Sequence, residues 1–348
     1  MRLIQPVTHS LDDILLKPQY SDINSRLDVD LSTKASRNFN LEIPIMATNM
    51  STITESKMMI LMSELGGVGV LHRFMPIFEQ TKEVRKATSG NYLDSIKNIP
   101  MVSVGVGDVE FERVQELYKH GVRHFLIDVA HAHSEQVSKQ LEKIKTEYSN
   151  VDVIVGNIAT QEASEFFLER GVDGIRVGIG GGSRCTTRTV TGHGVPNLHA
   201  LIETVYARDK YQHQQKHDSY IPIILDGGIK NSGDIVKALY FGADVACIGN
   251  LLAGTDATPG EPERTAGGLF KKYYGMSSKD AGRVRDGITP EGFSASVPYK
   301  GSTRTVIEEL VGGIRSGLTY SGARNIMELR RKGKAIYLSL AARMESKI

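Results

Sequence analysis

The strongest constraint on the fold is an alternation of short apolar runs with amphipathic stretches. Eight runs rich in β-branched and small residues recur in order along the chain: Ile43–Met50, Gly67–His72, Met101–Val106, Phe125–Ala130, Val151–Ile158, Gly174–Gly178, Ile221–Gly227 and Ala243–Gly249. Between them, stretches such as Glu110–His120, Glu135–Tyr148, Glu162–Arg170 and Gly233–Phe241 carry apolar residues at spacings of three and four. Continuous apolar strands that alternate with amphipathic helices are typical of a parallel sheet covered by helices. Eight such units predict an α/β fold of the (β/α)₈ TIM-barrel type.

The length of 348 residues fits one barrel of this kind or two ordinary domains. No internal repeat or low-complexity tract marks a second domain, so we expect a single barrel over residues 1–348. Thr303–Ser316 has the pattern of the eighth helix. Before it, residues 255–300 are rich in Gly, Pro and Thr and lack clear secondary structure, which is typical of an active-site flap or a disordered segment.

Charge and cysteine content narrow the class of protein. The formal net charge is +2, which predicts no nucleic-acid partner and no anionic-membrane partner. Cys185 and Cys247 are too few for a disulfide framework and predict a reducing compartment. Residues 1–17 lack the apolar core of a signal peptide, and no run reaches membrane-spanning length. We therefore expect a soluble, cytoplasmic protein.

Polar or glycine residues follow most of the predicted strands, and this is where a barrel carries its chemistry. Asp226–Gly228 and Gly249 follow the seventh and eighth strands, a common place for a phosphate, and Asp226 suits a ribose diol. Asp128, His131 and His133 follow the fourth strand. A metal site there is disfavoured, because no third His or Cys stands at ligand spacing.

The loop after the sixth strand, Gly178–Arg188, is the most informative stretch. Four glycines within five positions allow positive φ angles and a close approach of a ligand to the main chain. Cys185 then stands among hydroxyl and arginine side chains, where a cysteine nucleophile finds the groups that activate it. A buried, inert cysteine in a glycine-rich turn is the alternative, and the polar surroundings favour a catalytic residue.

In their order and spacing, the motifs resemble those of the IMP dehydrogenase and GMP reductase family over nearly the whole chain. The matching segments are Asp12–Leu16, Asp128–Ala130, Gly156–Asn157, Gly178–Arg188, Asp226–Gly228, Tyr274–Ser278, Pro290–Gly292 and Val297–Gly301. The resemblance implies a (β/α)₈ barrel that assembles as a homotetramer. It also implies a purine nucleoside monophosphate as ligand, with attack of Cys185 on the purine C2 atom.

The resemblance further implies a role for each site residue. Thr187 and Glu291 match the pair that relays a proton to the leaving amine, which is a poor leaving group without one. The implied nucleotide-binding residues are Ser183, Asp226, Gly227, Gly228, Gly249, Asn250, Tyr274, Gly275, Met276 and Ser277, with the phosphate at Ser183, Gly228, Gly249 and Tyr274. The nicotinamide cofactor is implied at Asp128, Ala130 and Asn157, and a K⁺ ion at the carbonyl groups of Gly180, Gly182 and Cys185.

Within the family, the sequence favours the reductase branch. Dehydrogenases usually insert regulatory modules after the second barrel strand, and the chain between Val70 and Met101 leaves no room for them. Dehydrogenases also hydrolyse their covalent adduct with an Arg-Tyr pair on the flap. Residues 279–289 contain Arg283 and Arg285 but no tyrosine. The expected activity is NADPH-dependent conversion of GMP to IMP and ammonia.

Other functions stay open at this point. One is an IMP dehydrogenase that lacks the regulatory insert. Another is a nucleotide-binding regulator without turnover, because Gly181, Arg184 and Asn250 depart from the proline, the small apolar residue and the Gly or Ser usual in the family. A flavin-binding barrel would share the phosphate motif, but it would not explain Cys185 with its threonines.

Overall fold

The computed structural model describes residues 8–88, 100–215, 220–281 and 289–345. Its centre is a closed barrel of parallel strands, in the order β10-β11-β4-β5-β6-β7-β8-β9 around the ring. The barrel strands are β4 (Ile45–Ala47), β5 (Val68–Leu71), β6 (Met101–Val104), β7 (His124–Asp128), β8 (Asp152–Ile158), β9 (Gly174–Val177), β10 (Ile223–Asp226) and β11 (Val245–Ile248). Each overlaps one of the eight apolar runs, so the predicted (β/α)₈ barrel is confirmed.

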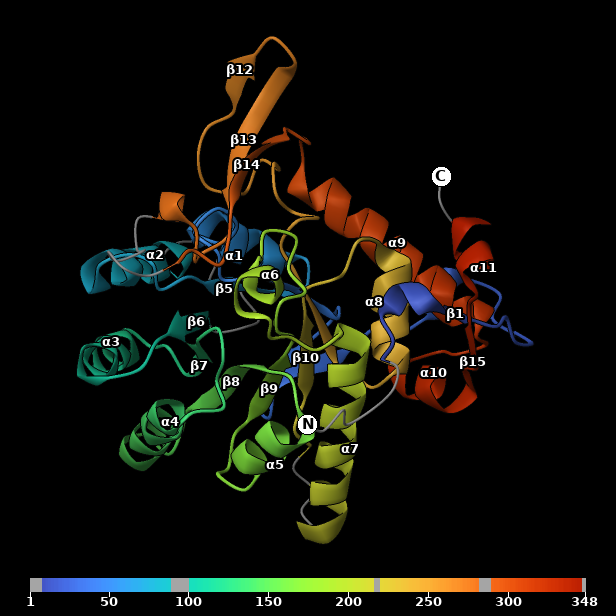
Figure 1. Cartoon of the computed structure of the whole chain (residues 1–348), viewed down its shortest axis with the longest axis horizontal. Helices are drawn as coiled ribbons and strands as arrows, with labels where there is room; N and C mark the ends of the chain where they lie inside the picture. The colour runs from blue at the N-terminus through green and yellow to red at the C-terminus, as the bar shows by residue number, and fades with distance from the viewer. Residues whose placement is uncertain (1–7, 89–99, 216–219, 282–288, 346–348) are drawn as a thin grey trace.

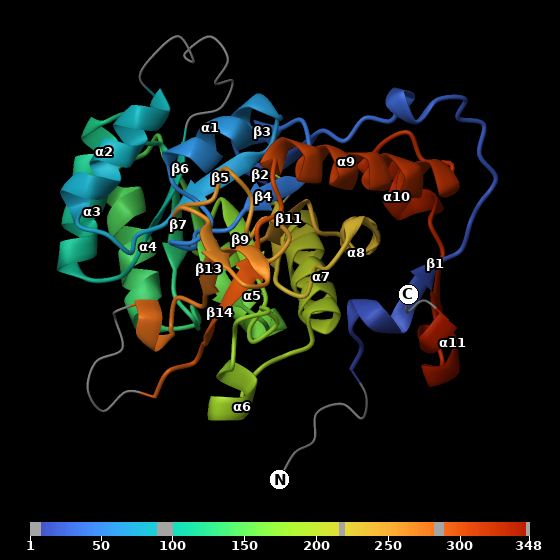
Figure 2. The same ribbon diagram turned by 90° about the horizontal axis from the view of Figure 1, so that it is seen from above.

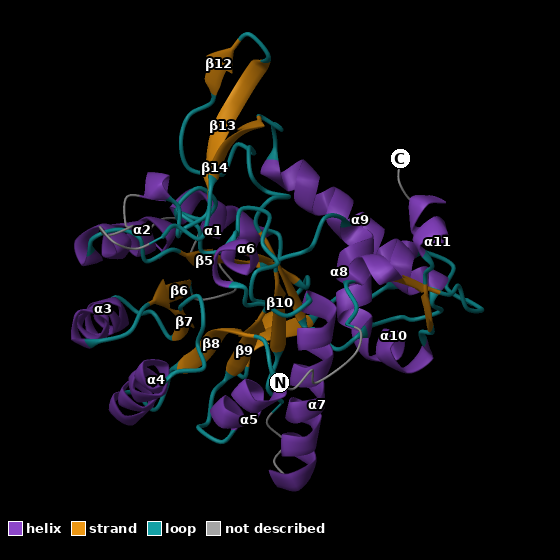
Figure 3. Cartoon of the chain, in the orientation of Figure 1, coloured by secondary structure: helices purple, strands orange, loops and turns teal. Residues whose placement is uncertain are grey.

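Helices surround the strands (Figures 1 and 3). In chain order they are α1 (Ser56–Glu64), α2 (Ile77–Thr88), α3 (Asp108–Lys119), α4 (Glu135–Glu147), α5 (Gln161–Leu168), the short α6 (Thr187–Thr191), α7 (Asn197–Gln215), α8 (Ser232–Tyr240) and α9 (Thr303–Tyr320). Their apolar spacing sets which face packs inward. In α4, for example, Val137, Leu141 and Ile144 recur on one face and are buried in the core.

The amino-terminal end of the barrel is closed by a hairpin of β2 (Thr33–Ser36) and β3 (Phe39–Leu41). Phe39 and Leu41 pack with the interior side chains of the barrel strands. The backbone N–H of Asn38 donates to Asp152 Oδ2 at 2.8 Å, which ties the hairpin to the start of β8. This end of the barrel is therefore filled, and the opposite end carries the cavity.

The flap, residues 255–300, forms an antiparallel sheet of β12 (Glu263–Thr265), β13 (Gly268–Tyr274) and β14 (Ser294–Pro298). The expectation that this segment lacks clear secondary structure is wrong for these residues. The sheet projects from the barrel (Figure 1), and its base is anchored by the buried ammonium group of Lys271. That group donates to the carbonyl oxygens of Thr255 and Thr258 at 3.0 and 2.7 Å.

Segments from the two ends of the chain pair at one side of the barrel (Figure 2). β1 (Ile14–Leu16) runs antiparallel to β15 (Ala335–Tyr337), which lies between α10 (Ile326–Lys332) and α11 (Leu340–Glu345). Across the described ranges, no helix has the length and apolar content needed to cross a membrane.

A buried histidine at the amino-terminal end of the barrel makes the stability of the protein depend on pH. His124 stacks on Phe39 with ring centroids 4.4 Å apart and lies 3.7 Å from Asp152. Burial lowers the pKa of His124, and the charge of Asp152 offsets this only in part. An unfolded histidine takes up its proton near pH 6.5, whereas folded His124 does so only at lower pH. The protein should therefore lose stability as the pH falls through about 6.5.

Replacing His124 by asparagine should remove this contribution. Below about pH 6.5, wild type should lose up to about 1.4 kcal/mol more unfolding free energy per pH unit than His124→Asn. Denaturant unfolding at a series of pH values from 7.5 to 5 measures the difference. If the unfolding free energies of the two proteins changed equally with pH, His124 would not be the source of the pH dependence.

Candidate active site

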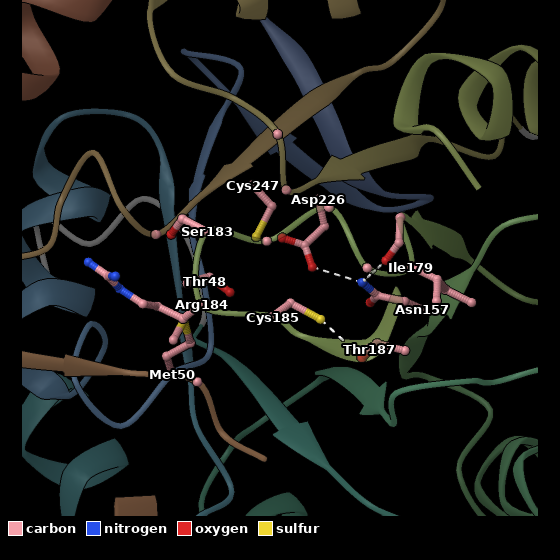
Figure 4. A pocket seen from close by; sticks show the side chains of 18 of the residues that line it. Thr48, Met50, Asn157, Ile179, Ser183, Arg184, Cys185, Thr187, Asp226 and Cys247 are labelled. Carbon is pink, nitrogen blue, oxygen red and sulfur yellow. Dashed lines mark hydrogen bonds between the residues drawn. The ribbon is translucent and has the colours of Figure 1, made fainter. Parts of the chain in front are cut away.

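A cavity of about 570 Å³ opens at the carboxyl ends of the barrel strands. Its walls are formed by the loops that follow the barrel strands and by the flap (Figure 4). The structure brings together in these walls every residue that the sequence assigned to the site except Tyr274: Asp128, Ala130, Asn157, Gly180, Gly182, Ser183, Cys185, Thr187, Asp226, Gly227, Gly228, Gly249, Asn250, Gly275, Met276, Ser277 and Glu291.

Tyr274 is the exception, and its neighbour Tyr273 takes the position facing the cavity. The Tyr273 side chain is 3 % exposed, and its hydroxyl lies 3.4 Å from Ser183 Oγ. The Tyr274 hydroxyl lies instead 3.4 Å from Ser51 Oγ. Successive side chains of a strand point to opposite faces, so only one of these two can face Ser183. Tyr273, and not the predicted Tyr274, therefore lines the cavity beside Ser183.

The loop after β9 passes very close to the end of β10. Gly178 has a φ of 136°, and a Cβ atom there would lie 2.1 Å from the carbonyl oxygen of Asp226, so only glycine fits. A Cβ atom at Gly181 would lie 2.4 Å from Asn197 Oδ1. Asn197 in turn donates to the carbonyl oxygen of Gly227 at 2.6 Å. The asparagine thus fills the space beside Gly181, where the resemblance leads one to expect a proline.

Cys185 lies at one end of a chain of hydrogen bonds. Its thiol donates to Thr187 Oγ1 at 3.0 Å, and that hydroxyl donates to Glu291 Oε2 at 2.8 Å. The flap holds this arrangement through its backbone. The N–H of Thr186 donates to the carbonyl oxygen of Glu291 at 2.9 Å, and Cys185 forms an antiparallel bridge with Gly292. The nucleophile and the carboxylate come from distant parts of the chain and share one short ribbon of backbone pairing.

The floor of the cavity contains Arg176, which the sequence analysis missed. Arg176 lies in β9 and is buried. Its Nη2 atom donates to Asp226 Oδ2 at 2.8 Å, its Nη1 atom to Asn49 Oδ1 at 2.6 Å, and Nη1 also lies 3.4 Å from Asp128 Oδ1. Burial alone would lower the pKa of this guanidinium, but the two carboxylates outweigh burial and raise it. Asn157 Nδ2 adds a hydrogen bond to the same Asp226 oxygen at 2.8 Å. The sequence did contain a signal for Arg176, because a charged residue inside an apolar strand is unusual and indicates a specific role.

Arg73 and Asn197 are two further wall residues that the sequence analysis did not assign to the site. Arg73 follows β5, and its Nε atom donates to the carbonyl oxygen of Asp128 at 3.2 Å. Arg73 stands just after β5, and Asn197 is the first residue of α7. These positions in the chain could have indicated that both residues line the cavity. The flap residues Arg283 and Arg285, on which the branch argument depends, lie outside the described residues.

Cys247 and the pair His131 and His133 differ from Cys185 in their surroundings. Cys247 lies in β11 and is 2 % exposed, and burial together with the nearby Asp226 carboxylate raises the pKa of its thiol. The rings of His131 and His133 are 6.4 Å apart. In the ranges that the structure covers, no three His, Cys, Asp or Glu side chains group in a way that could hold a metal ion.

Residues 8–348 match the family model described as "IMP dehydrogenase / GMP reductase domain". The chain belongs to this family. Family members are oxidoreductases that act on purine nucleoside monophosphates with a nicotinamide cofactor. The chain is 36% identical over 386 residues to the inosine-5′-monophosphate dehydrogenase of Cryptosporidium parvum, covering 97% of this chain and 94% of that protein.

Two more distant family members help to place the chain. It is 32% identical over 472 residues to the inosine-5′-monophosphate dehydrogenase of Aquifex aeolicus, covering 97% of this chain and 94% of the relative. It is 29% identical over 476 residues to a protein named GMP reductase from Leishmania major, covering 96% and 95%. Both alignments are longer than this chain, so both relatives carry segments that it lacks. Chain length therefore does not separate these two relatives, one named a dehydrogenase and one a reductase.

The environments of the two cysteines predict different reactivities. Iodoacetamide should alkylate Cys185 in the folded protein, while Cys247 should react far more slowly, because it is buried and burial raises the pKa of its thiol. Peptide mass spectrometry after a timed reaction measures both rates. Cys185→Ser is the control and should leave the folded protein almost unlabelled. Rapid labelling of Cys247 in native wild type would refute the assignment.

Proposed function

We propose that the protein is an NADPH-dependent GMP reductase, which converts GMP to IMP and ammonia through a covalent bond between Cys185 and the purine C2 atom. The observation that carries the proposal is the hydrogen-bond chain from Cys185 Sγ through Thr187 Oγ1 to Glu291 Oε2. A thiol nucleophile next to a hydroxyl and a carboxylate suits a reaction in which a proton must reach a leaving amine.

The residues divide the work as follows. Cys185 attacks C2 of the nucleotide, and the C2–N bond to the amino group breaks once that nitrogen has gained a proton. Glu291 holds that proton and Thr187 passes it on, because the hydroxyl lies within hydrogen-bond distance of both the sulfur and the carboxylate. When C2 has been reduced, the C2–sulfur bond breaks and the Cys185 thiolate is regenerated with release of IMP.

The nicotinamide cofactor supplies the hydride to C2 in this scheme, and the wall opposite the phosphate end has groups that suit it. Asn157 Oδ1 is buried and has no hydrogen-bond partner in the described part of the chain, so it can accept an N–H from a carboxamide. Asp128 and Ala130 line the same side of the cavity. We assign these three residues to the cofactor.

An IMP dehydrogenase is the second candidate, and the 36% identity to the Cryptosporidium parvum dehydrogenase favours it. The sequence between Ser278 and Pro290 argues for the reductase. A dehydrogenase must activate water at C2, and an isolated arginine is a poor base because its pKa exceeds about 12. Without a tyrosine beside Arg283 or Arg285, this segment lacks the expected pair.

The proposal includes a monovalent cation and self-assembly. We assign K⁺ to the carbonyl oxygens of Gly180, Gly182 and Cys185, since a glycine-rich loop can turn several carbonyl groups toward one ion. We further propose a homotetramer. Exposed apolar side chains gather on the carboxyl-terminal segment, where Tyr337, Leu340 and Met344 are all exposed, and such a surface suits contact with other subunits.

The direction of the reaction is the first test. GMP with NADPH should give IMP and ammonia with NADPH consumed, while IMP with NAD should give at most very slow XMP formation. Nucleotide chromatography and an ammonia assay follow both reactions. Steady XMP production faster than NADPH oxidation with GMP would replace the proposal by the dehydrogenase. Tight nucleotide binding without turnover in either direction would instead favour a regulator.

The proton path is the second test. Thr187→Ala and Glu291→Gln should each lower kcat by about 10²-fold or more, the usual size for general acid–base catalysis. The double variant should be little slower than either single one, because both residues serve one path. Glu263→Gln, which changes an exposed flap carboxylate, is the control and should keep full activity. Multiplicative losses in the double variant would show that the two residues act independently.

A further inference from the structure

Arg184, the residue before the nucleophile, is held between two aromatic rings of the flap. Its guanidinium carbon lies 5.0 Å from the centroid of the Tyr273 ring and 5.1 Å from that of Phe293. The Arg184 carbonyl oxygen also accepts the N–H of Phe293 at 3.3 Å. In Figure 4 the Arg184 side chain extends away from the sulfur of Cys185. The side chain is therefore placed by the flap and serves something other than the thiol.

Among the described residues the Arg184 guanidinium has no hydrogen-bond acceptor and no ion pair, unlike the other cations of the cavity wall. Arg73 pairs with Asp128, Arg176 with Asp226, Lys230 with Asp12, and Arg188 with the carbonyl oxygens of Ile179 and Val195. Arg184 Nε is buried without a hydrogen-bond partner within the ranges that the structure describes. A buried donor without a partner destabilises the protein, and an acceptor on a ligand would remove that cost.

The guanidinium lies at the end of the cavity that suits a phosphate. Tyr273, one of its two ring neighbours, has its hydroxyl 3.4 Å from Ser183 Oγ. The same hydroxyl would be 3.2 Å from a Cβ atom at Gly249, so it faces the loop after β11. Loops after the seventh and eighth strands are where barrels commonly hold phosphate. Of the described cations in the wall, Arg184 combines this position with an unused charge.

We propose that Arg184 binds the 5′-phosphate of the nucleotide and supplies the cation that selects a nucleotide over a nucleoside. The two neighbouring rings restrict the position of the guanidinium, and its N–H groups still lack an acceptor among the described residues. A fixed guanidinium edge matches two phosphate oxygens at once, and a bond between two charged groups is stronger than the neutral hydrogen bonds of Ser183 and Tyr273. This inference uses only the nucleoside monophosphate ligand of the proposed function and does not depend on the reaction direction.

A structural role for Arg184 as a latch between loop and flap makes a different prediction. A latch would affect every ligand of the cavity alike, because its loss would loosen the flap over the whole site. Phosphate recognition affects only ligands that carry the phosphate. The comparison of a nucleotide with its own nucleoside therefore separates the two roles.

The experiment measures binding by calorimetry for GMP with guanosine and for IMP with inosine, using wild type and Arg184→Met. Methionine keeps much of the apolar stem and removes the charge. The Kd of both nucleotides should rise by about 10- to 100-fold, a typical loss for a charge-assisted pair, while nucleoside binding should change less than about twofold. The salt dependence of nucleotide binding should weaken in the variant.

Two further variants complete the test. Lys272→Met removes an equal charge from an exposed side chain of β13 and should leave all affinities unchanged. Arg184→Lys should recover part of the nucleotide affinity, since it restores charge without the two-pronged edge. Equal losses for nucleotide and nucleoside, or no loss of nucleotide affinity, would overturn the proposal. Because only binding is measured, a protein that turns over IMP rather than GMP would still give a result.

Discussion

The buried ion cluster around Arg176 is the interaction on which the site depends. One guanidinium on β9 contacts Asp226 at the end of β10, Asn49 after β4 and Asp128 at the end of β7. Loss of one partner from such a buried cluster typically costs 3–5 kcal/mol, because the remaining charges stay buried without compensation. The cluster therefore fixes three strand ends relative to one another.

The chemistry rests on a second contact, between the catalytic loop and the flap. Backbone pairing of Cys185 with Gly292, and of Thr186 with Glu291, sets the carboxylate against the Thr187 hydroxyl. In the proposed reaction, the barrel supplies the nucleophile and the flap supplies the proton donor. That reaction needs the loop and the flap in one register, and the buried ammonium group of Lys271 anchors the base of the flap sheet.

Much of this architecture could be predicted from the sequence. The alternation of apolar runs with amphipathic stretches predicted the barrel. The residues that follow the predicted strands included most of those found in the cavity wall. Arg176 was missed because it lies within an apolar strand and its charged partners are distant in the sequence, so no local pattern indicates that they meet. Tyr273 and Tyr274 are successive residues of one strand, so their side chains point to opposite faces. Which of them faces the cavity can be told only when the register of that strand is known. The flap sheet was missed because most of its side chains are exposed and only a few, such as Tyr273 and Val297, are buried in the core.

The separation of Thr187 from Glu291 has a consequence for synthesis of the protein. The two residues that share a proton are 104 positions apart, and the seam between β4 and β11 also joins distant segments. At about 5–20 residues per second, a ribosome releases the thiol loop roughly 5 to 20 seconds before the carboxylate. During that interval the nascent chain has the Cys185 loop but neither Glu291 nor most of the flap. A chain that terminates before Glu291 keeps the Cys185 thiol and loses the carboxylate at the other end of its hydrogen-bond chain.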